Sequence, residues 1–236
     1  MRFYFCNKSG VKSTARWVAG IALLLSSAFA WSADSASPPG PGDVVGKVTT
    51  NIMTLVREAP AYFDDDPDRY INAVGAELDS VVDFRSFARG VMGDYASSAR
   101  YRAMTEEQRE RLREQLNRFT TVLRDGIVNT YSRGLLAFGS SRVELGETEI
   151  SPGSTRVASV NQYVYAEDGK TYTVKYQMGQ YKDGSWRLRN LIIENINLGE
   201  IYRGQFAAAA ASAEGNLDLV IDSWDDSQIR ARAEEG

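Results

Sequence analysis

The spacing of apolar residues along the chain changes near residue 140. Before that point apolar residues recur every three or four positions, which places them on one face of a helix. The longest such run follows Thr105-Glu106-Glu107-Gln108, a sequence that can cap the first turn of a helix. Its apolar face is Leu112, Leu116, Phe119, Leu123, Ile127 and Tyr131. Residues 43–140 therefore predict a helical lobe.

From Arg142 onward the spacing of apolar residues is two, which is typical of strands with one buried face. Turns are predicted at Pro152-Gly153, Asp168-Gly169 and Asp183-Gly184, because Asp-Gly suits the positive φ angles of a tight hairpin turn. The strands between them are residues 142–150, 155–165, 171–181 and 186–196. Together these elements predict an α+β fold, a twisted antiparallel sheet of about four strands covered by helices.

Hairpin turns of two residues would set the register of the last three strands. Glu167 would then lie opposite Lys170, and Lys182 opposite Ser185. One face would collect the apolar residues Tyr163, Tyr165, Tyr172, Val174, Tyr176, Met178, Leu191 and Ile193. The other would collect Gln162, Thr173, Lys175, Gln177, Asn190, Ile192 and Glu194, with Tyr181, Trp186 and Leu188 at one end. The apolar face needs a cover, and the helices are the available cover.

The last strand passes directly into a helix at Asn197-Leu198-Gly199. Ile201, Tyr202 and Phe206 follow at helical spacing, and Gly215 divides this region into two short helices. The run of five alanines at 207–211 indicates either close helix packing and helix propensity or space left for a ligand. We expect residues 141–226 to form the sheet and C-terminal helices, sharing one core with the helical lobe, and residues 227–236 to form a polar tail.

The first thirty residues have the pattern of a secretory signal. Four basic residues precede a short apolar core at residues 17–25, and Ala28-Phe29-Ala30 is a small-x-small cleavage pattern. This core is shorter than the roughly 20 residues that span a bilayer. Residues 1–30 therefore predict a signal peptide, residues 31–42 a flexible leader, and the mature protein an exported, periplasmic one.

Composition excludes several kinds of chemistry. The chain has no histidine, and its one cysteine, Cys6, lies in the predicted signal peptide, which excludes thiolate nucleophiles, imidazole bases and the usual zinc sites. Removing residues 1–30 takes away four positive charges and no negative ones, so the formal charge falls from −4 to −8. So acidic a chain is poorly suited to nucleic acid or to unaided binding of anionic lipid. The least solvent-like carboxylates, and so the candidates for a general base, are Asp83, Glu194 and Asp222.

Several motifs, in order, resemble the toluene-tolerance family of periplasmic proteins. They are Val82-Asp83-Phe84, Ala88 to Tyr95, Thr105 to Leu112, Tyr131, Trp186, Leu191 to Glu194, Tyr202 to Phe206 and Gly215 to Val220. The resemblance covers roughly residues 43–225. The chain departs from the family at Asn190, where an aspartate is usual, at Asn195, where a glycine is usual, and at Asn197, where a serine is usual. It also has Ala96 where an aromatic residue is common, and a slightly long segment at residues 97–104.

The resemblance implies a soluble carrier of the pathway that maintains outer-membrane lipid asymmetry. Its fold would be related to the nuclear-transport-factor-like cone, in which sheet and helices enclose a deep apolar cavity for the acyl chains of a glycerophospholipid. The partners it implies are an ABC-type lipid transport complex in the inner membrane and a lipoprotein-porin complex in the outer membrane. No catalysis, cofactor or metal is implied, and the phospholipid is cargo.

The predicted register and the resemblance together suggest which residues line such a cavity. The sheet would supply Tyr163, Tyr172, Val174, Tyr176, Leu191 and Ile193, and the helices Phe87, Val91, Phe119, Leu123, Ile127, Tyr202 and Phe206. Two arginines are candidates for contact with the phosphate of the headgroup. Arg189 would be the one charge on the inward face, beside Met178, and Arg203 lies in a matched motif.

Two other functions remain open on the sequence alone. An isomerase-like enzyme of related shape would need a carboxylate buried beside a tyrosine inside the cavity. A binder of small apolar or aromatic solutes would hold no fatty-acyl material.

Overall fold

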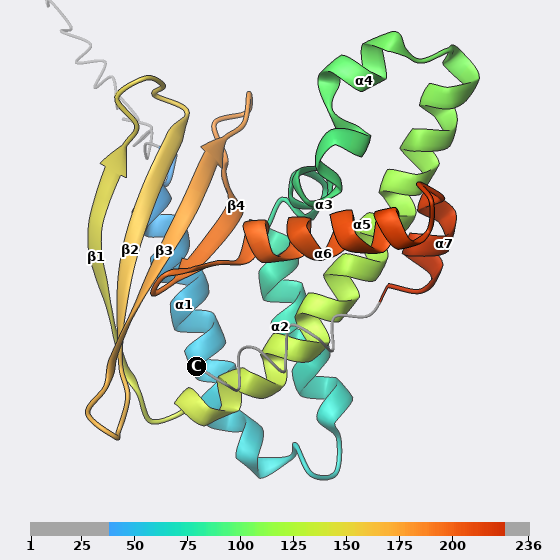
Figure 1. Cartoon of the computed structure of the whole chain (residues 1–236). Helices are drawn as coiled ribbons and strands as arrows, with labels where there is room; N and C mark the ends of the chain where they lie inside the picture. Colours follow the sequence, from blue (N-terminus) through green and yellow to red (C-terminus); the bar gives the residue numbers. More distant parts are fainter. Residues whose placement is uncertain (1–37, 225–236) are drawn as a thin grey trace, which may run out of the picture. The chain divides into compact units, whose positions relative to one another are not determined.

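The computed structural model describes residues 38–224, which form seven α-helices, three short 3-10 helices and a five-stranded antiparallel sheet (Figure 1). The helices are α1 Pro41–Glu58, η1 Ala59–Ala61, α2 Pro67–Val81, α3 Phe84–Met92, η2 Gly93–Ala96, α4 Ser98–Ala103, α5 Glu106–Leu135, η3 Leu136–Phe138, α6 Leu198–Ser212 and α7 Leu217–Asp222. The strands are β1 Arg142–Ile150, β2 Val157–Tyr165, β3 Thr171–Gln180, β4 Trp186–Ile193 and β5 Ile196–Asn197. The predicted α+β class is confirmed. The predicted signal peptide and tail lie outside the described residues.

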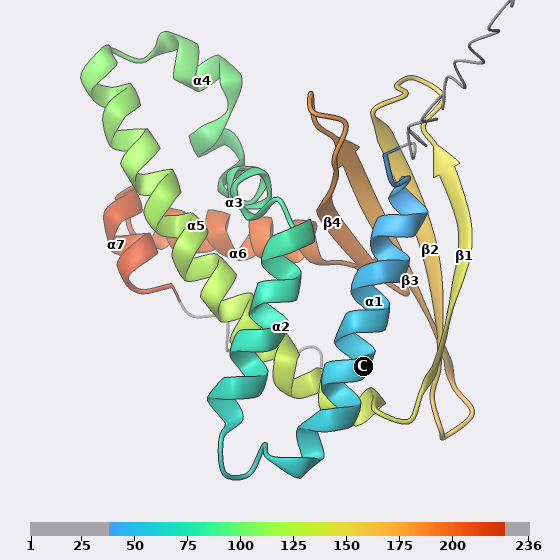
Figure 2. The same cartoon turned by 180° about the vertical axis from the view of Figure 1, so that it is seen from behind.

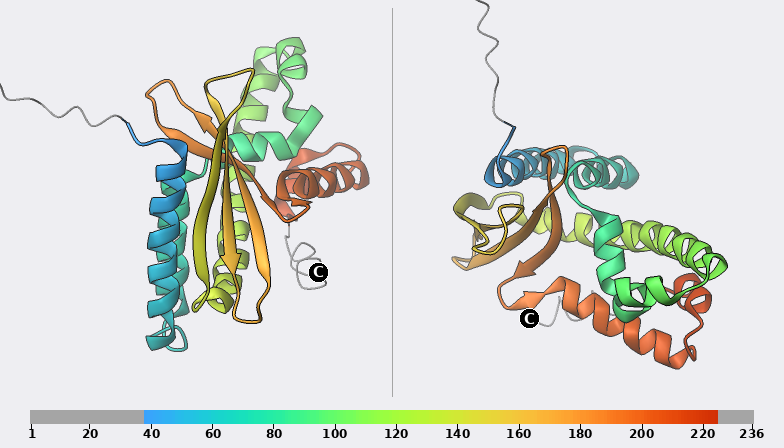
Figure 3. Two further views of the ribbon diagram at one scale, coloured as in Figure 1. Left: turned by 90° about the vertical axis from the view of Figure 1, so that its left-hand side faces the viewer. Right: turned by 90° about the horizontal axis from the view of Figure 1, so that it is seen from above.

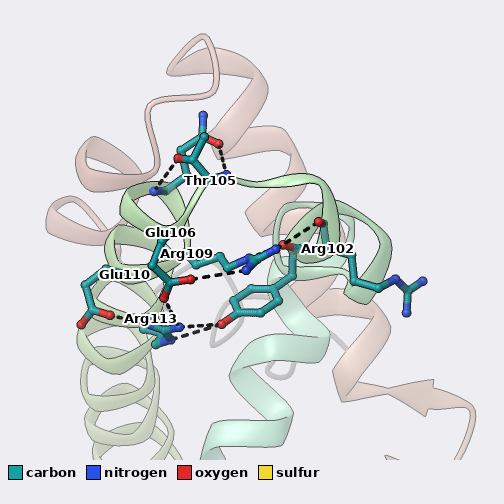
Figure 4. Close-up of polar contacts among 8 residues, drawn as sticks. Arg102, Thr105, Glu106, Arg109, Glu110 and Arg113 are labelled. Carbon is teal, nitrogen blue, oxygen red and sulfur yellow. Dashed lines mark hydrogen bonds and ion pairs between the residues drawn. The ribbon is translucent and has the colours of Figure 1, made fainter.

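Side-chain caps define where several helices begin. Thr105 and Gln108 form the predicted capping box at the start of α5, and Asp66 accepts a hydrogen bond from the backbone N–H of Arg69 at the start of α2. Figure 4 shows that α5 is also fastened to α4: Arg109 donates from Nε to the carbonyl of Tyr101 at 3.1 Å and from an Nη to that of Arg102 at 3.2 Å. These bonds occupy carbonyls at the C-terminal end of α4.

The sheet is a meander in the order β1-β2-β3-β4-β5, with helices on one face. Helix α1 runs along that face against β1, β2 and β4, and the ends of α2, α3 and α6 contact β4 (Figures 1 and 2). In the left view of Figure 3 the near face of the sheet has no described helix in front of it. We call these the covered face and the open face.

The hairpin between β2 and β3 has a three-residue loop rather than the predicted two. Ala166 donates to the carbonyl of Lys170, and Gly169 has φ +83°, so Glu167-Asp168-Gly169 is a turn closed by a residue in the left-handed region. Val164 therefore pairs with Tyr172, and Tyr163 with Thr173. A shift of one residue moves every side chain of β2 to the other face.

The predicted placement of Tyr163 and Tyr165 on the covered face is consequently wrong. Both lie on the open face, where the ring of Tyr163 covers Gly146 so closely that an added Cβ would be 2.7 Å from a ring carbon. Gln162, predicted on the wet face, is on the covered face and only 3% exposed.

The hairpin between β3 and β4 has the same three-residue loop, at residues 182–184, but a bulge corrects its register. Tyr181 donates to the carbonyl of Ser185, and Met178 pairs with Leu188. The register then shifts at Arg189, so that Tyr176 pairs with Leu191 and Val174 with Ile193, as predicted. Because of the bulge, Trp186 and Leu188 share the covered face with Met178 and pack with it, which corrects their predicted place on the opposite face.

Buried apolar side chains form three clusters. The first joins α3, η2, α5, α6 and α7 and includes Phe119, Leu123, Tyr202 and Phe206. The second joins α1, α2 and α5, and the third joins α1 to the sheet. Val48 packs against both the second and the third cluster, so α1 connects the helices to the sheet.

Candidate functional site

One end of the covered face carries apolar side chains that belong to none of the three clusters. Val174 is 9% exposed, and the apolar side chains around it on this face are half-buried rather than fully buried. Phe138 of η3 contacts Tyr172 edge-on, with 6.0 Å between ring centroids. Helix α6 begins where β4 and β5 end (Figure 1). We call this group the sheet site, and its members are Val164, Tyr172, Val174, Leu191 and Ile193.

A polar chain of contacts lies where the sheet site adjoins the third cluster, because Tyr176 packs against that cluster and pairs with Leu191. The hydroxyl of Tyr176 donates to the side-chain carbonyl of Gln162 at 2.7 Å, and the amide nitrogen of Gln162 donates to the hydroxyl of Thr49 on α1 at 2.7 Å. Burial raises the pKa of Tyr176 well above its usual range. These bonds satisfy polar groups that would otherwise be costly to bury, and they fix α1 on the sheet.

The helical residues that were predicted to line a cavity do lie close to one another, but they pack against each other in or beside the first cluster. Phe119, Tyr202 and Phe206 are fully buried, and the rings of Phe119 and Phe206 lie 4.9 Å apart. Val91 and Leu123 are buried beside them. Phe87 and Ile127 are half-buried at the margin of this cluster, and Phe87 meets Tyr202 edge-on at 5.7 Å.

The two arginines predicted to meet a headgroup are both exposed and lie apart from the sheet site. Arg189 sits in the bulge of β4, not on the inward face beside Met178 as predicted. Its guanidinium covers Gly179 and lies 5.6 Å from the ring centre of Tyr181. Arg203 donates from Nε to the carbonyl of Gly90 at 3.0 Å, which fastens α6 to α3.

The sequence reasoning missed two members of this region. Val164 was not named as a candidate. It pairs with Tyr172 and alternates along β2 with Gln162 and Val160, so a three-residue loop would have placed it on the covered face. Phe138 follows the longest helix, and its contact with Tyr172 depends on how that helix meets the sheet. No local pattern specifies that contact.

The carboxylates considered as general bases all have structural partners. Asp83 caps α3 by accepting from the backbone N–H of Ser86 at 3.0 Å, and its other oxygen accepts from the hydroxyl of Tyr181. Glu194, in a turn with φ +53°, accepts from the backbone N–H of Thr173. Asp222 pairs with Arg118. Among residues 38–224 no group of three potential metal ligands occurs, and none of the described helices has the length and apolar character needed to cross a membrane.

The departures from the family pattern at Asn190 and Asn197 form a hydrogen-bonded junction. Asn190 donates to the side-chain oxygens of Gln177 and Asn197, each at 2.9 Å, and accepts from the backbone N–H of Gly199 at 3.0 Å. Asn197 also caps α6. The junction therefore holds the start of α6 against β3 and β4 through side chains on the open face, opposite to the sheet site.

Residues 46–226 match the model of the MlaC protein family. The chain belongs to the MlaC family. MlaC proteins are periplasmic, non-catalytic phospholipid-binding shuttles that transport lipid between membranes, so the predicted family, function class and lack of catalysis are confirmed.

One known protein is similar to this chain in sequence, and one solved structure is similar to it in fold. The chain is 28% identical over 185 residues to toluene tolerance protein ttg2D of Pseudomonas putida, covering 78% of this chain and 79% of that protein. Its fold matches that of a phospholipid-binding protein from Ralstonia solanacearum solved in complex with a phospholipid. That match has a TM-score of 0.61 and 16% identity, and covers 76% of this chain and 91% of the other.

Proposed function

We propose that this MlaC protein carries glycerophospholipids across the periplasm and holds their acyl chains against the sheet site. The observation that supports this proposal is the half-buried apolar group on the covered face, which lies outside all three packed clusters. An apolar surface that a folded protein leaves partly open is suited to an apolar ligand. The related fold from Ralstonia solanacearum was solved with a phospholipid bound.

The energetics of lipid transfer explain why such a surface is needed. An acyl chain of about sixteen carbons costs roughly 12 kcal/mol to expose to water, at about 0.8 kcal/mol per methylene. A carrier must replace most of that burial with its own apolar side chains. In our proposal Tyr172, Val174, Leu191 and Ile193 provide one wall, and Phe87 and Ile127, at the margin of the first cluster, provide the facing side.

The residues of the filled first cluster have a different role in this proposal. Phe119, Leu123, Tyr202 and Phe206 form the rigid support behind Phe87 and Ile127 rather than the contact surface itself, because they are already covered by one another. Tyr163 is not part of the site, because its side chain is on the open face of the sheet.

Delivery in this proposal depends on protein partners. Residues 1–30 direct export, and the mature chain then exchanges lipid with an ABC-type complex in the inner membrane and a lipoprotein-porin complex in the outer membrane. Its acidic charge disfavours general adsorption to anionic bilayers. Docking to protein complexes avoids that repulsion.

Native mass spectrometry of protein purified without added lipid tests the proposal. We expect the wild-type chain to retain phospholipid, and Leu191→Asp to lose it, because a carboxylate in an acyl-chain site is strongly unfavourable. Ile192→Asp is the matched control, since the adjacent side chain points to the open face. Absence of any phospholipid from the wild-type protein, or recovery of only small aromatic solutes, would refute the proposal. Circular dichroism verifies that both variants are folded.

A further inference from the structure

A pocket lies on the surface between the α3-η2 segment and α6, and no step of lipid carriage described above uses it. Its volume is about 440 Å³. Residues of α3, of η2 and of the start of α4 line the pocket, together with Arg203 and Ala207 of α6. The polar residues around it are Ser86, Arg89, Asp94, Ser97, Ser98 and Arg203.

The pocket contains two guanidinium groups without a carboxylate partner. Within residues 38–224, neither Arg89 nor Arg203 takes part in an ion pair. By contrast, Arg109 and Arg113 at the start of α5 are committed to carboxylates (Figure 4). Asp94 is the one carboxylate lining the pocket, so the two arginines leave a net positive charge.

The geometry of Arg203 keeps most of its donors available. Its alkyl stem crosses Gly93, where an added Cβ would be 3.6 Å from its Cγ, and its Nε bonds the carbonyl of Gly90 at 3.0 Å. This contact fixes the side chain, and among residues 38–224 neither terminal Nη group has a hydrogen-bond partner, so both can donate to a ligand. A third guanidinium, that of Arg100, lies 5.4 Å from the ring centre of Tyr95, which also lines the pocket.

We propose that this pocket binds a phosphate group. Arginine presents planar paired donors that match phosphate oxygens, and two arginines on different helices can grip one group from two directions. The hydroxyls of Ser86 and Ser98 add neutral donors at the same site. The phosphate can belong to a glycerophospholipid headgroup or to a free phosphate ion, because both present the same oxygens.

The pocket is separate from the sheet site. Val91 and Met92, each 1% exposed, line the pocket and are also part of the filled first cluster. Closely packed side chains therefore lie behind it. Binding of phosphate here does not depend on the proposed acyl-chain site, and the two proposals can fail independently.

Nuclear magnetic resonance titration of the purified protein tests the pocket. Inorganic phosphate and glycerol phosphate should produce saturable shifts in the backbone amides of Gly90 and Gly93 and in the Nε–H of Arg203, whereas glycerol should not. Arg89→Gln and Arg203→Gln should each weaken binding at least about tenfold, the usual effect of losing a charged hydrogen bond. Arg203→Lys keeps the charge but loses the planar pair of donors, so binding should also weaken.

Arg102→Gln is the matched control, because it removes one exposed arginine from α4 outside the pocket. Phosphate binding should be unchanged in this variant. No saturable shift with either phosphate, or equal loss in Arg102→Gln, would overturn the proposal. All four variants replace exposed side chains, and their thermal unfolding verifies the fold.

Comparison of the two ligands identifies the source of the phosphate. A lipid headgroup is the ligand if two results are found together. Glycerol phosphate binds more tightly than inorganic phosphate, and the protein floats with vesicles of phosphatidylcholine and phosphatidylglycerol whereas Arg203→Gln does not. Tighter binding of inorganic phosphate, with no flotation, assigns the pocket to a free ion. Either result supports a phosphate site.

Discussion

The first cluster and the sheet site are built from the same kinds of residues but differ in how completely they are covered. In the first cluster, Phe119, Tyr202 and Phe206 are fully buried among side chains from α3, α5, α6 and α7. At the sheet site, Tyr172, Leu191 and Ile193 are half-buried and belong to no cluster. Side chains buried against one another stabilise the fold, and side chains left partly open are available to a ligand.

Two leucines allow this difference to be measured directly. Leu123→Ala in the first cluster should lower the free energy of unfolding by about 2–5 kcal/mol, because it leaves a cavity in a packed core. Leu191→Ala, in lipid-free protein, should cost less than half as much, because that side chain is already partly exposed. Denaturant unfolding of both variants provides the comparison. Equal losses would mean that the sheet site is ordinary core.

Removing the hydrogen bond between Tyr176 and Gln162 should lower the free energy of unfolding by an intermediate amount. Tyr176→Phe removes the donor to Gln162 and leaves its carbonyl oxygen without that partner, at a cost of about 1–3 kcal/mol. Tyr163→Phe, on the open face, serves as the control and should be close to neutral. Thermal and denaturant unfolding measure both. Similar behaviour of the two tyrosines would contradict the assignment of faces.

Substitution of Arg189, in the bulge of β4, should have the smallest effect on the free energy of unfolding. Arg189 is exposed, so Arg189→Ala should change the free energy of unfolding by no more than about 0.5 kcal/mol. Lipid retention should also stay at the wild-type level, because the side chain lies apart from the sheet site. A loss of bound phospholipid in this variant would return Arg189 to the role of headgroup ligand.

The helices and strands could be predicted from local sequence, whereas the face of the sheet on which each side chain lies could be predicted only in part. The capping box at Thr105 and the period of two after Arg142 correctly predicted α5 and the four long strands. Asp-Gly fits both two-residue and three-residue hairpin loops, since each contains a position with positive φ. At Gly169 and Gly184 the longer loop is the one formed.

The bulge explains why one half of the candidate site was predicted and the other was not. Near the turn, the pairing of β3 with β4 differs by one residue from the predicted pairing. The bulge at Arg189 restores the predicted pairing, so Val174, Tyr176, Leu191 and Ile193 share a face as predicted. No bulge corrects β2 against β3, so Tyr163 was predicted on the wrong face and Val164 was not predicted at all. Bulges arise from packing across the whole sheet, and nothing in the local sequence at Arg189 signals one.

In our proposal, acyl chains contact the covered face at the sheet site. The most direct test of this proposal is nuclear magnetic resonance of the protein loaded with phospholipid, observing contacts between acyl methylene protons and the methyl groups of β4. We predict contacts to the methyls of Leu191 and Ile193 and none to those of Ile192. Contacts confined to Ile192, or absent from all three residues in protein that demonstrably holds lipid, would contradict this account.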